Sequence, residues 1–555
     1  MNMQRRSARI ALCAAVWTAA LVGASAQVPR DRAASPAAPG AIAGTAVVTG
    51  RVTVTSPNGP QPVRRATVTL EAASLRTPLV VATDTDGRFR FEQVPAARFR
   101  IRSEKAGVVP FVDDPRRAFD AEAELDVKAG QSVSHDLRMQ PGAAIEGRIL
   151  NDAGDPAVNV QVSAVRMAYD ATGRKPTAVR QVRTDDLGRF RVHTLPPGEY
   201  FVDAAPDALA VATAAPMGAN PSVLARNYFP GTTRLDEARV VVVTAGQSVT
   251  NVDFGLTRVA VASLRGQVLN AAGQPAKGAS VRLQRVGGPV GEVRGGGPAG
   301  ENTFIFQAVP PGEYWLMGTW RATPTADPEF SASRIVVGGE SMPNLTVQTA
   351  AVPALRGRIE GGTIPPGVQV IAYETSYEWP APQLDRAFSW LASVAPDGTF
   401  AFPFLPGPRL LRLVGVDVPP AITKIRVMET DVTDAPFEVA AGQNAGAVIE
   451  IAPVASLAGV VMRGGAPLAH ARVVVFAVDE RTWGPRSRTV RAGESGADGR
   501  FDVRGLPPGD YLVVAQEFLE ANAWNDPAVL RRLKEQALAL SLGAGVTTRT
   551  LEVKR

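Results

Sequence analysis

One hairpin motif recurs along the chain and constrains its fold more than any other feature. The copy at residues 497–514 has the sequence ADGRFDVRGLPPGDYLVV. Asp498 and Gly499 form a turn pair that tolerates positive φ, and Phe501 and Val503 alternate with polar residues, which predicts a strand with one apolar face. The Pro-Pro-Gly that follows reverses the chain, because proline presets φ and glycine supplies positive φ. The stretch therefore predicts a β-hairpin.

Earlier stretches repeat this pattern, and each copy is preceded by a strand signal that opens on a glycine. The copies lie at residues 84–99, 185–200, 302–314 and 396–408. The opening glycines are Gly50, Gly147, Gly266, Gly357 and Gly459. Their spacing, about 90 to 120 residues, is typical of whole domains in tandem and too long for the units of a solenoid. The sequence therefore predicts an all-β protein of five tandem β-sandwich domains.

The expected organisation begins with an exported leader. Arginines near the start, an apolar run and the small residues Ala24-Ser-Ala26 are typical of a secretory signal peptide. The last domain inserts one helix at about 526–540, with Asn525 or Asp526 as its cap. We expect a signal peptide at 1–26, a disordered tether at 27–46, and β-sandwiches at 47–141, 142–258, 259–351, 352–453 (divergent) and 454–555. Closing strands run directly into the next opening strand, which predicts a stiff or gently bent rod.

Charge and cysteine content bound the partners and the compartment. Cys13 is the only cysteine and lies in the predicted signal peptide, so disulfides do not hold the mature chain together. Removing three leader arginines from 59 basic residues leaves 56 against 53 acidic ones, a net charge of +3. We therefore expect no nucleic-acid partner. No second apolar run reaches the roughly 18 residues of a membrane span, so we expect no transmembrane segment after signal cleavage. The predicted location is the periplasm, the outer surface or the extracellular space.

The motifs together resemble a known family. The combination Gly-x-Val, Gly-x-Pro-x-x-Gly-Ala-x-Val, Thr-Asp-x-x-Gly-x-Phe and Leu-Pro-Pro-Gly-x-Tyr resembles the carboxypeptidase regulatory-like domain, and residues 184–200 and 266–281 match it well. The resemblance covers nearly the whole mature chain and implies seven-stranded, Ig-like or transthyretin-like β-sandwiches. In the first copy the Pro-Pro-Gly is missing, and in the fourth Arg409 stands where the others have an aromatic residue. In the family, such domains flank zinc carboxypeptidases, precede outer-membrane receptors or stand in tandem in secreted bacterial proteins, and some relatives of the fold bind carbohydrate.

The residues that could carry catalysis or hold a metal are scattered. His135, His193 and His470 fall in three different predicted domains, whereas a zinc peptidase needs closely spaced ligands. The start of a calcium-like loop at residues 84–87 lacks the distant bidentate glutamate, which favours a hairpin turn. Residues 493–497 approach a nucleophile elbow, but an alanine replaces its second glycine. We therefore predict no enzyme activity, no catalytic residue, no metal site and no cofactor.

These observations favour a non-catalytic exported binding or spacer protein, with carbohydrate as the expected ligand class and a polysaccharide or another cell-envelope protein as partner. The alternative is an accessory or regulatory subunit of a metallocarboxypeptidase or outer-membrane receptor system. The candidate ligand-binding residues are Tyr373, Tyr377, Trp379 and Trp390 in the fourth domain, because flat aromatic faces near carboxylates suit sugar rings. The competing interpretation is that these rings form the core and rim of a divergent sandwich.

Overall fold

Strands and the turns and loops between them make up almost all of the described part of the chain. The computed structural model describes residues 44–553 apart from residues 73, 76, 113–114, 118, 120–122, 172, 207–221, 287–292, 299 and 375–389. Within this part the protein is all-β, as the sequence predicts, and α2 (Pro527–Lys534) is its one α-helix. The predicted signal peptide and most of the predicted tether lie outside the described residues.

Five large clusters of buried apolar side chains follow one another along the described chain. They span residues 46–139, 143–256, 262–347, 355–451 and 455–551. We call these parts units 1 to 5. In each unit the cluster draws its side chains from the strands of two sheets, because alternating apolar residues turn one face of each sheet inward. The exact number and bounds of the domains stay a prediction.

The sheets of units 1 and 2 carry the following strands. Unit 1 has one sheet of β2 (Gln61–Pro62), β1 (Ala46–Val54), β10 (Leu137–Pro141), β7 (Val108–Pro110), β5 (Arg88–Val94) and β9 (Ser132–Ser134), and another of β4 (Leu79–Ala82), β3 (Thr67–Glu71), β6 (Ala97–Glu104) and β8 (Ala123–Val127). Unit 2 has β14 (Arg189–Leu195), β11 (Ala143–Leu150), β19 (Ser248–Val249) and β20 (Phe254–Gly255), opposite β13 (Gly173–Arg183), β12 (Gln161–Asp170), β15 (Gly198–Ala205), β17 (Asn227–Tyr228) and β18 (Val241–Val243), with β16 (Ser222–Leu224) paired to β21 (Arg258–Ala260).

The remaining units follow the same plan. Unit 3 has β25 (Gly297–Pro298), β26 (Thr303–Val309), β22 (Ala262–Leu269) and β29 (Met342–Gln348), opposite β24 (Val293–Gly295), β23 (Ser280–Arg285), β27 (Gly312–Trp320), β28 (Glu329–Val337) and β30 (Ala350–Ala351). Unit 4 has β34 (Thr399–Phe402), β31 (Ala354–Glu360), β38 (Asn444–Ala452), β36 (Ala421–Val427) and β37 (Thr430–Asp431), opposite β33 (Leu391–Ser393), β32 (Gln369–Glu374) and β35 (Arg409–Val414). Unit 5 has β40 (Ala466–Pro467), β39 (Ala455–Arg463), β43 (Arg500–Leu506) and β46 (Gly545–Glu552), opposite β42 (Val490–Glu494), β41 (Arg472–Ala477), β44 (Gly509–Gln516) and β45 (Leu538–Leu542).

The opening glycine of each unit has a steric reason. In unit 5, strand β39 pairs antiparallel with β43 and parallel with the closing strand β46. A Cβ on Gly459 would lie 1.6 Å from the carbonyl oxygen of Arg549 and 3.1 Å from the ring of Phe501. The motif phenylalanine therefore covers the glycine, and the closing strand comes too close for any side chain. The four other opening glycines are in the same position. A Cβ there would lie within 3 Å of a backbone carbonyl oxygen of the segment that closes the unit, and within about 3 Å of the motif phenylalanine ring. These glycines are Gly50, Gly147, Gly266 and Gly357.

The tyrosine of the Pro-Pro-Gly-x-Tyr motif closes the turn that precedes it. In unit 5 the Tyr511 hydroxyl donates a hydrogen bond to the carbonyl oxygen of Pro507 at 2.6 Å. The same bond joins Tyr200 to the carbonyl of Pro196 at 2.7 Å, and an equivalent one is present in unit 3. Burial raises the pKa of Tyr511 to about 12, so the hydroxyl stays protonated and available as a donor.

We expect Tyr511→Phe to destabilise unit 5 by about 1 kcal/mol, because it removes this bond and leaves a buried carbonyl without its partner. Hydrogen exchange of the β44 amides in the full chain measures the loss. Tyr200→Phe is the matched variant and should lower protection in unit 2 while leaving unit 5 unchanged. Unaltered β44 protection in Tyr511→Phe would contradict the assigned role.

In unit 4 an arginine replaces the motif tyrosine and takes over its contact. Arg409 is fully buried, and its guanidinium donates to the carbonyl oxygen of Pro406 at 2.7 and 3.0 Å. It pairs with Glu374 at 3.5 Å, and strand register places Glu374 directly opposite Arg409. The unit that departs most from the motif in sequence therefore keeps the contact by which the motif closes its turn.

The helix of unit 5 covers the outer face of the second sheet, as its apolar stripe predicts. The Asp526 carboxylate caps the first turn by accepting from the amide of Ala528 at 2.8 Å. Val529 and Leu530 are buried against side chains of β41 and β44. The predicted C-terminal limit was wrong: the helix ends at Lys534, and the leucines that follow alternate with small residues in β45, which pairs with β44.

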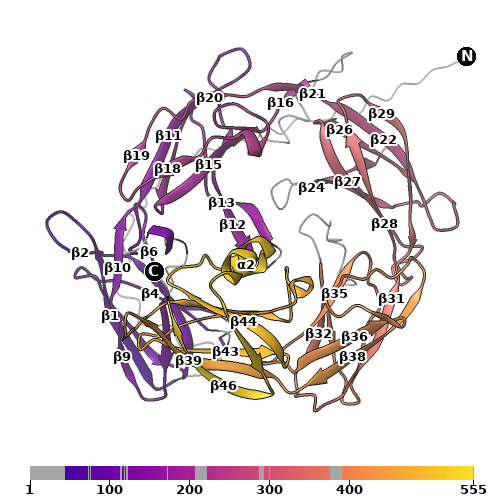
Figure 1. The fold of residues 1–555 in the computed structure, drawn as a ribbon. Coiled ribbons are helices and arrows are strands. Elements are labelled where there is room, and N and C mark those ends of the chain that lie inside the picture. Colours follow the sequence, from indigo (N-terminus) through magenta and orange to yellow (C-terminus); the bar gives the residue numbers. More distant parts are fainter. Residues whose placement is uncertain are drawn as a thin grey trace, which may run out of the picture.

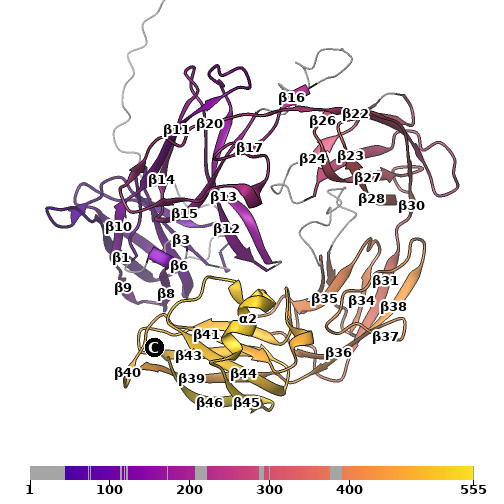
Figure 2. The same cartoon turned by 45° about the horizontal axis from the view of Figure 1, so that its top comes forward.

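The five units are arranged in a ring. Figure 1 shows that the chain runs through units 1 to 4 around the ring and that unit 5 lies beside units 1 and 2, with α2 facing the end of β12. Figure 2 shows the same neighbours from a second direction. The expectation of a rod was therefore wrong, because each unit turns relative to the previous one and the last unit returns to the first.

Two arginines of η1 (Pro115–Arg117) in unit 1 make contacts that close the ring. The guanidinium of Arg117 donates to the carbonyl oxygen of His470 at 2.7 Å and also to that of Glu517, both in unit 5. The guanidinium groups of Arg116 and Arg117 lie 5.2 and 5.7 Å from the ring centre of Phe518. These contacts join residues that are more than 300 positions apart.

The tip of the β12–β13 hairpin in unit 2 makes the second set of ring-closing contacts. Arg166 forms an ion pair with Glu520 at 2.9 Å, and Asn525 of η4 (Ala523–Asn525) donates to the carbonyl oxygen of Asp170 at 3.2 Å. The Tyr169 side chain packs against the cluster that holds α2 on its sheet. Units 1 and 2 therefore both contact unit 5, and both sets of contacts close the ring.

Candidate functional site

The structure describes two of the four aromatic residues that the sequence predicts to bind a ligand. Tyr373 lies on β32, and Trp390 immediately precedes β33. Tyr377 and Trp379 fall in 375–389, outside the described residues. Both described rings are partly buried, and Trp390 packs against the core of unit 4. Sugar binding at these four residues stays a prediction.

Each of the two described rings has an arginine against one face. The guanidinium of Arg486 lies 4.0 Å from the ring centre of Tyr373, and that of Arg409 lies 3.9 Å from the ring centre of Trp390. Arg409 belongs to unit 4 itself, whereas Arg486 comes from unit 5. The contact at Tyr373 therefore crosses the junction between units 4 and 5.

Tyr373 lines a cavity of about 710 Å³ at this junction. Unit 4 contributes the end of β35 and residues 417–422, and unit 5 contributes residues 486–492 and 502–507. Arg98 of unit 1 and Ala171 of unit 2 complete the wall, together with Trp524 of η4. Four of the five units therefore contribute to one cavity, and two of them reach it only because the ring is closed.

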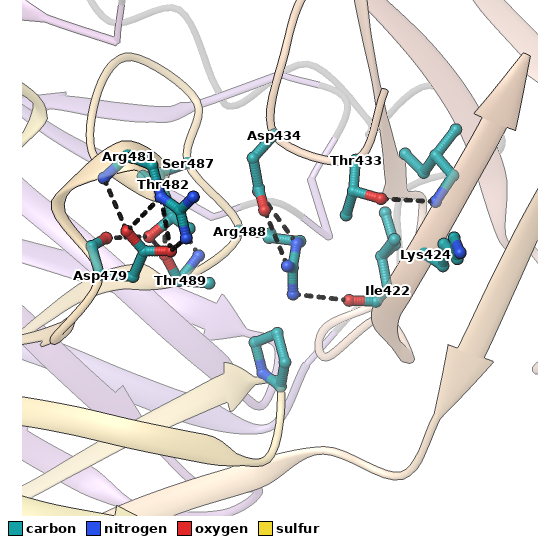
Figure 3. Close-up of polar contacts among 12 residues, drawn as sticks. Ile422, Lys424, Thr433, Asp434, Asp479, Arg481, Thr482, Ser487, Arg488 and Thr489 are labelled. Atoms are coloured by element: carbon teal, nitrogen blue, oxygen red, sulfur yellow. Dashed lines mark hydrogen bonds and ion pairs between the residues drawn. The ribbon is translucent and has the colours of Figure 1, made fainter. Parts of the chain in front are cut away.

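The junction between units 4 and 5 is held by paired side chains that Figure 3 shows. Arg488 donates to both carboxylate oxygens of Asp434, at 2.8 and 3.0 Å, and to the carbonyl oxygen of Ile422 at 3.0 Å. The Nε of Arg412 donates across the junction to the carbonyl oxygen of Arg486 at 2.8 Å. A bidentate arginine–carboxylate pair is geometrically specific, so it fixes the relative position of the two cavity walls.

The loop that presents these arginines is held by its own hydroxyl groups. The Ser487 hydroxyl donates to the carbonyl oxygen of Thr482 at 2.7 Å, and the Thr489 hydroxyl donates to the Thr482 side chain at 2.9 Å. Asp479 caps η3 (Glu480–Thr482) at the start of the loop by accepting from the Arg481 amide. Figure 3 shows these residues beside the Arg488–Asp434 pair. The loop is therefore preorganised.

Positive charge dominates the cavity. The cavity is lined by only two aspartates, Asp417 and Asp502, but by six arginines. The arginines are Arg98, Arg412, Arg486, Arg488, Arg491 and Arg504. Burial lowers the pKa of Arg412 to about 10; the Asp434 carboxylate opposes this shift, and the charges of Arg488 and Arg491 add to it. Burial also lowers the pKa of Arg491. Arginine side chains stay protonated in proteins at neutral pH, so the cavity is cationic.

Sequence reasoning missed this site, although part of it had a local signature. Arg486, Arg488 and Arg491 lie within six residues of each other and follow one strand of unit 5. Arg412 and Arg98 have no such signature, because only the packing of whole units brings them to the same wall. The sequence did single out Tyr373, which lines the cavity.

The histidines and acidic residues make other contacts. The His193 ring hydrogen-bonds to the hydroxyl of Thr194 at 2.8 Å, and the His470 ring to Glu494 at 2.9 Å. In the loop at 84–87, one Asp84 carboxylate oxygen accepts two backbone amides and so caps the hairpin turn. Within the described ranges, no group of three or more His, Cys, Asp or Glu residues is placed to hold a metal ion, and no helix is long and apolar enough to cross a membrane.

Comparison with known proteins assigns a family to the first part of the chain. Residues 47–140 match the family model of the carboxypeptidase regulatory-like domain. Unit 1 is therefore similar to a carboxypeptidase regulatory-like domain over nearly its whole length. A search of curated proteins finds no match. The family match confirms the resemblance for unit 1, which lacks the Pro-Pro-Gly, and the resemblance of the later units stays a prediction.

Comparison with solved structures finds matches at low identity and low TM-score. GBS52, the minor pilin of Streptococcus agalactiae, is 13% identical, with 39% of this chain and 97% of that chain covered and a TM-score of 0.21. BcpA, the major pilin subunit of Bacillus cereus, is 13% identical, with 55% and 99% covered and a TM-score of 0.14. The Bacillus anthracis TIE protein is 15% identical, with 55% of this chain but only 51% of that chain covered and a TM-score of 0.16. At these scores the likeness carries no argument about function.

Proposed function

We propose that the protein is a non-catalytic exported binding protein and that the cavity between units 4 and 5 is its saccharide-binding site. The observation that supports this proposal is the cavity wall, in which the Tyr373 ring and Trp524 stand among arginine side chains. Aromatic faces stack on sugar rings, and guanidinium groups donate hydrogen bonds to their oxygen atoms. The cavity volume falls within the roughly 300 to 1,000 Å³ that is common for small-ligand sites.

The test is binding of the mature full chain to an array of neutral and acidic glycans, followed by Tyr373→Ala. We expect a loss of affinity of about fivefold for the best ligand, because one stacking contact contributes on the order of 1 kcal/mol. Phe111→Ala is the matched control, since Arg138 lies over that ring at 4.1 Å in unit 1, away from the cavity. Absence of binding to every glycan would overturn the proposal.

The family match of unit 1 favours one alternative, an accessory role in a carboxypeptidase or receptor system. In that case the cavity would take a segment of a protein partner. Capture of a peptidase from the same cell envelope that survives both Tyr373→Ala and added glycan would favour this alternative over saccharide binding.

A further inference from the structure

The six arginines of the cavity divide into two groups by their partners. The first group is neutralised: each member pairs with a carboxylate on the protein. These pairs are Arg488 with Asp434, Arg504 with Asp502 and Arg98 with Glu124. The remaining three arginines, Arg412, Arg486 and Arg491, form the second group.

The second group has no carboxylate partner among the described residues. Arg412 donates to the backbone carbonyls of Leu411 and Thr433 as well as to that of Arg486, and Arg491 donates to the carbonyls of Ser487 and Val490. The Nε of Arg486 is buried and has no hydrogen-bond partner. Carbonyl oxygens orient these guanidinium groups. The Asp434 carboxylate, already paired with Arg488, also attracts the charge of Arg412, so two arginines share one carboxylate.

The three arginines of the second group are held close together. Arg412 is only 8% exposed; the Asp434 carboxylate attracts its charge, while the charges of Arg488 and Arg491 repel it. The backbone of Arg486 has a φ of 60°, and its carbonyl oxygen accepts from Arg412, so the two residues hold each other in place. A cluster of partly desolvated like charges costs free energy unless an anion relieves it.

We propose that Arg412, Arg486 and Arg491 form an anion site, which binds a carboxylate, sulfate or phosphate group of the ligand in this cavity. This proposal rests on the proposed function, because it takes the cavity as the saccharide-binding site. It adds that the saccharide is acidic. The Tyr373 ring beside Arg486 supplies an apolar face for the sugar, while the guanidinium groups supply charge-assisted hydrogen bonds for its acidic group.

The experiment compares three oligosaccharides of equal length with the mature full chain by titration calorimetry: a sulfated heparin fragment, an oligogalacturonate and a neutral dextran. We expect both acidic ligands to bind at least tenfold more tightly than the dextran. Arg486→Gln and Arg491→Gln should each weaken acidic binding by roughly 10- to 100-fold, the usual effect of losing a hydrogen bond to a charged group. Binding should also weaken as salt is raised.

The matched control is Arg500→Gln, which removes an exposed arginine of β43 in the same unit; this arginine is paired with Asp498. It should leave affinity unchanged, and circular dichroism should show that all variants are folded. Equal affinity for dextran and the acidic ligands, or variants within twofold of the native protein, would overturn the anion site while leaving saccharide binding intact. Binding of sodium sulfate, lost in Arg486→Gln, without binding of any saccharide would support the anion site and reject the proposed function.

Discussion

The triple variant Arg117→Ala/Arg166→Glu/Tyr169→Ser should open the ring, and small-angle scattering should show a large increase in the radius of gyration. A strand of nine residues is about 30 Å long, so five units end to end would measure about 150 Å, with a radius of gyration of about 43 Å. A solid globule of about 510 residues would have about 24 Å. The native ring should lie between these values, and the variant should shift toward the larger one.

The physical reason is that closure depends on few contacts, most of them polar. The Arg166–Glu520 ion pair and the stacking of Arg117 on Phe518 contribute on the order of 1 kcal/mol each. Glutamate at position 166 would place two carboxylates side by side, and serine at position 169 would remove an apolar contact with the α2 cluster. The units themselves should keep their stability, because their cores lie elsewhere.

Charge restoration provides the control. Adding Glu520→Arg to Arg166→Glu recreates the ion pair in reverse and should return the scattering profile of that single variant toward the native one. The open variant should also bind the cavity ligand more weakly, because Arg98 and Ala171 leave the wall. An extended native protein, or a triple variant that scatters as the native protein does, would contradict ring closure.

The sequence predicts the inside of each unit far better than the relation between units. Alternating apolar residues and turn pairs are local, so the hairpins, the opening glycines and the helix cap follow from the residues themselves. Ring closure depends on Arg117, Arg166 and the segment 517–525, which have no periodicity and lie in loops and at a hairpin tip. The cavity depends on the same long-range placement, which explains why one of its aromatic residues could be predicted while its arginines could not.

The arginine that replaces the motif tyrosine in unit 4 can be explained only from its contacts in the structure. We expect Arg409→Ala to destabilise unit 4 by about 3 to 5 kcal/mol, the usual cost of breaking a buried ion pair by removing one partner. The change would leave the Pro406 carbonyl without its donors, Glu374 without its cation and Trp390 without the group on its face. Hydrogen exchange of the β35 amides in the full chain measures the loss.

Two variants separate this role from general sensitivity to mutation. Arg356→Ala removes an exposed arginine of β31 in the same unit and should change stability by no more than about 0.5 kcal/mol. The double change Arg409→Tyr/Glu374→Ala transplants the pair that faces each other in unit 5, where register places Tyr511 opposite Ala477. Because the tyrosine hydroxyl can again donate toward Pro406 and no unpaired carboxylate remains, the double variant should recover at least half of the loss. A cost below about 1 kcal/mol for Arg409→Ala, or no recovery in the double variant, would show that the arginine does not replace the motif tyrosine.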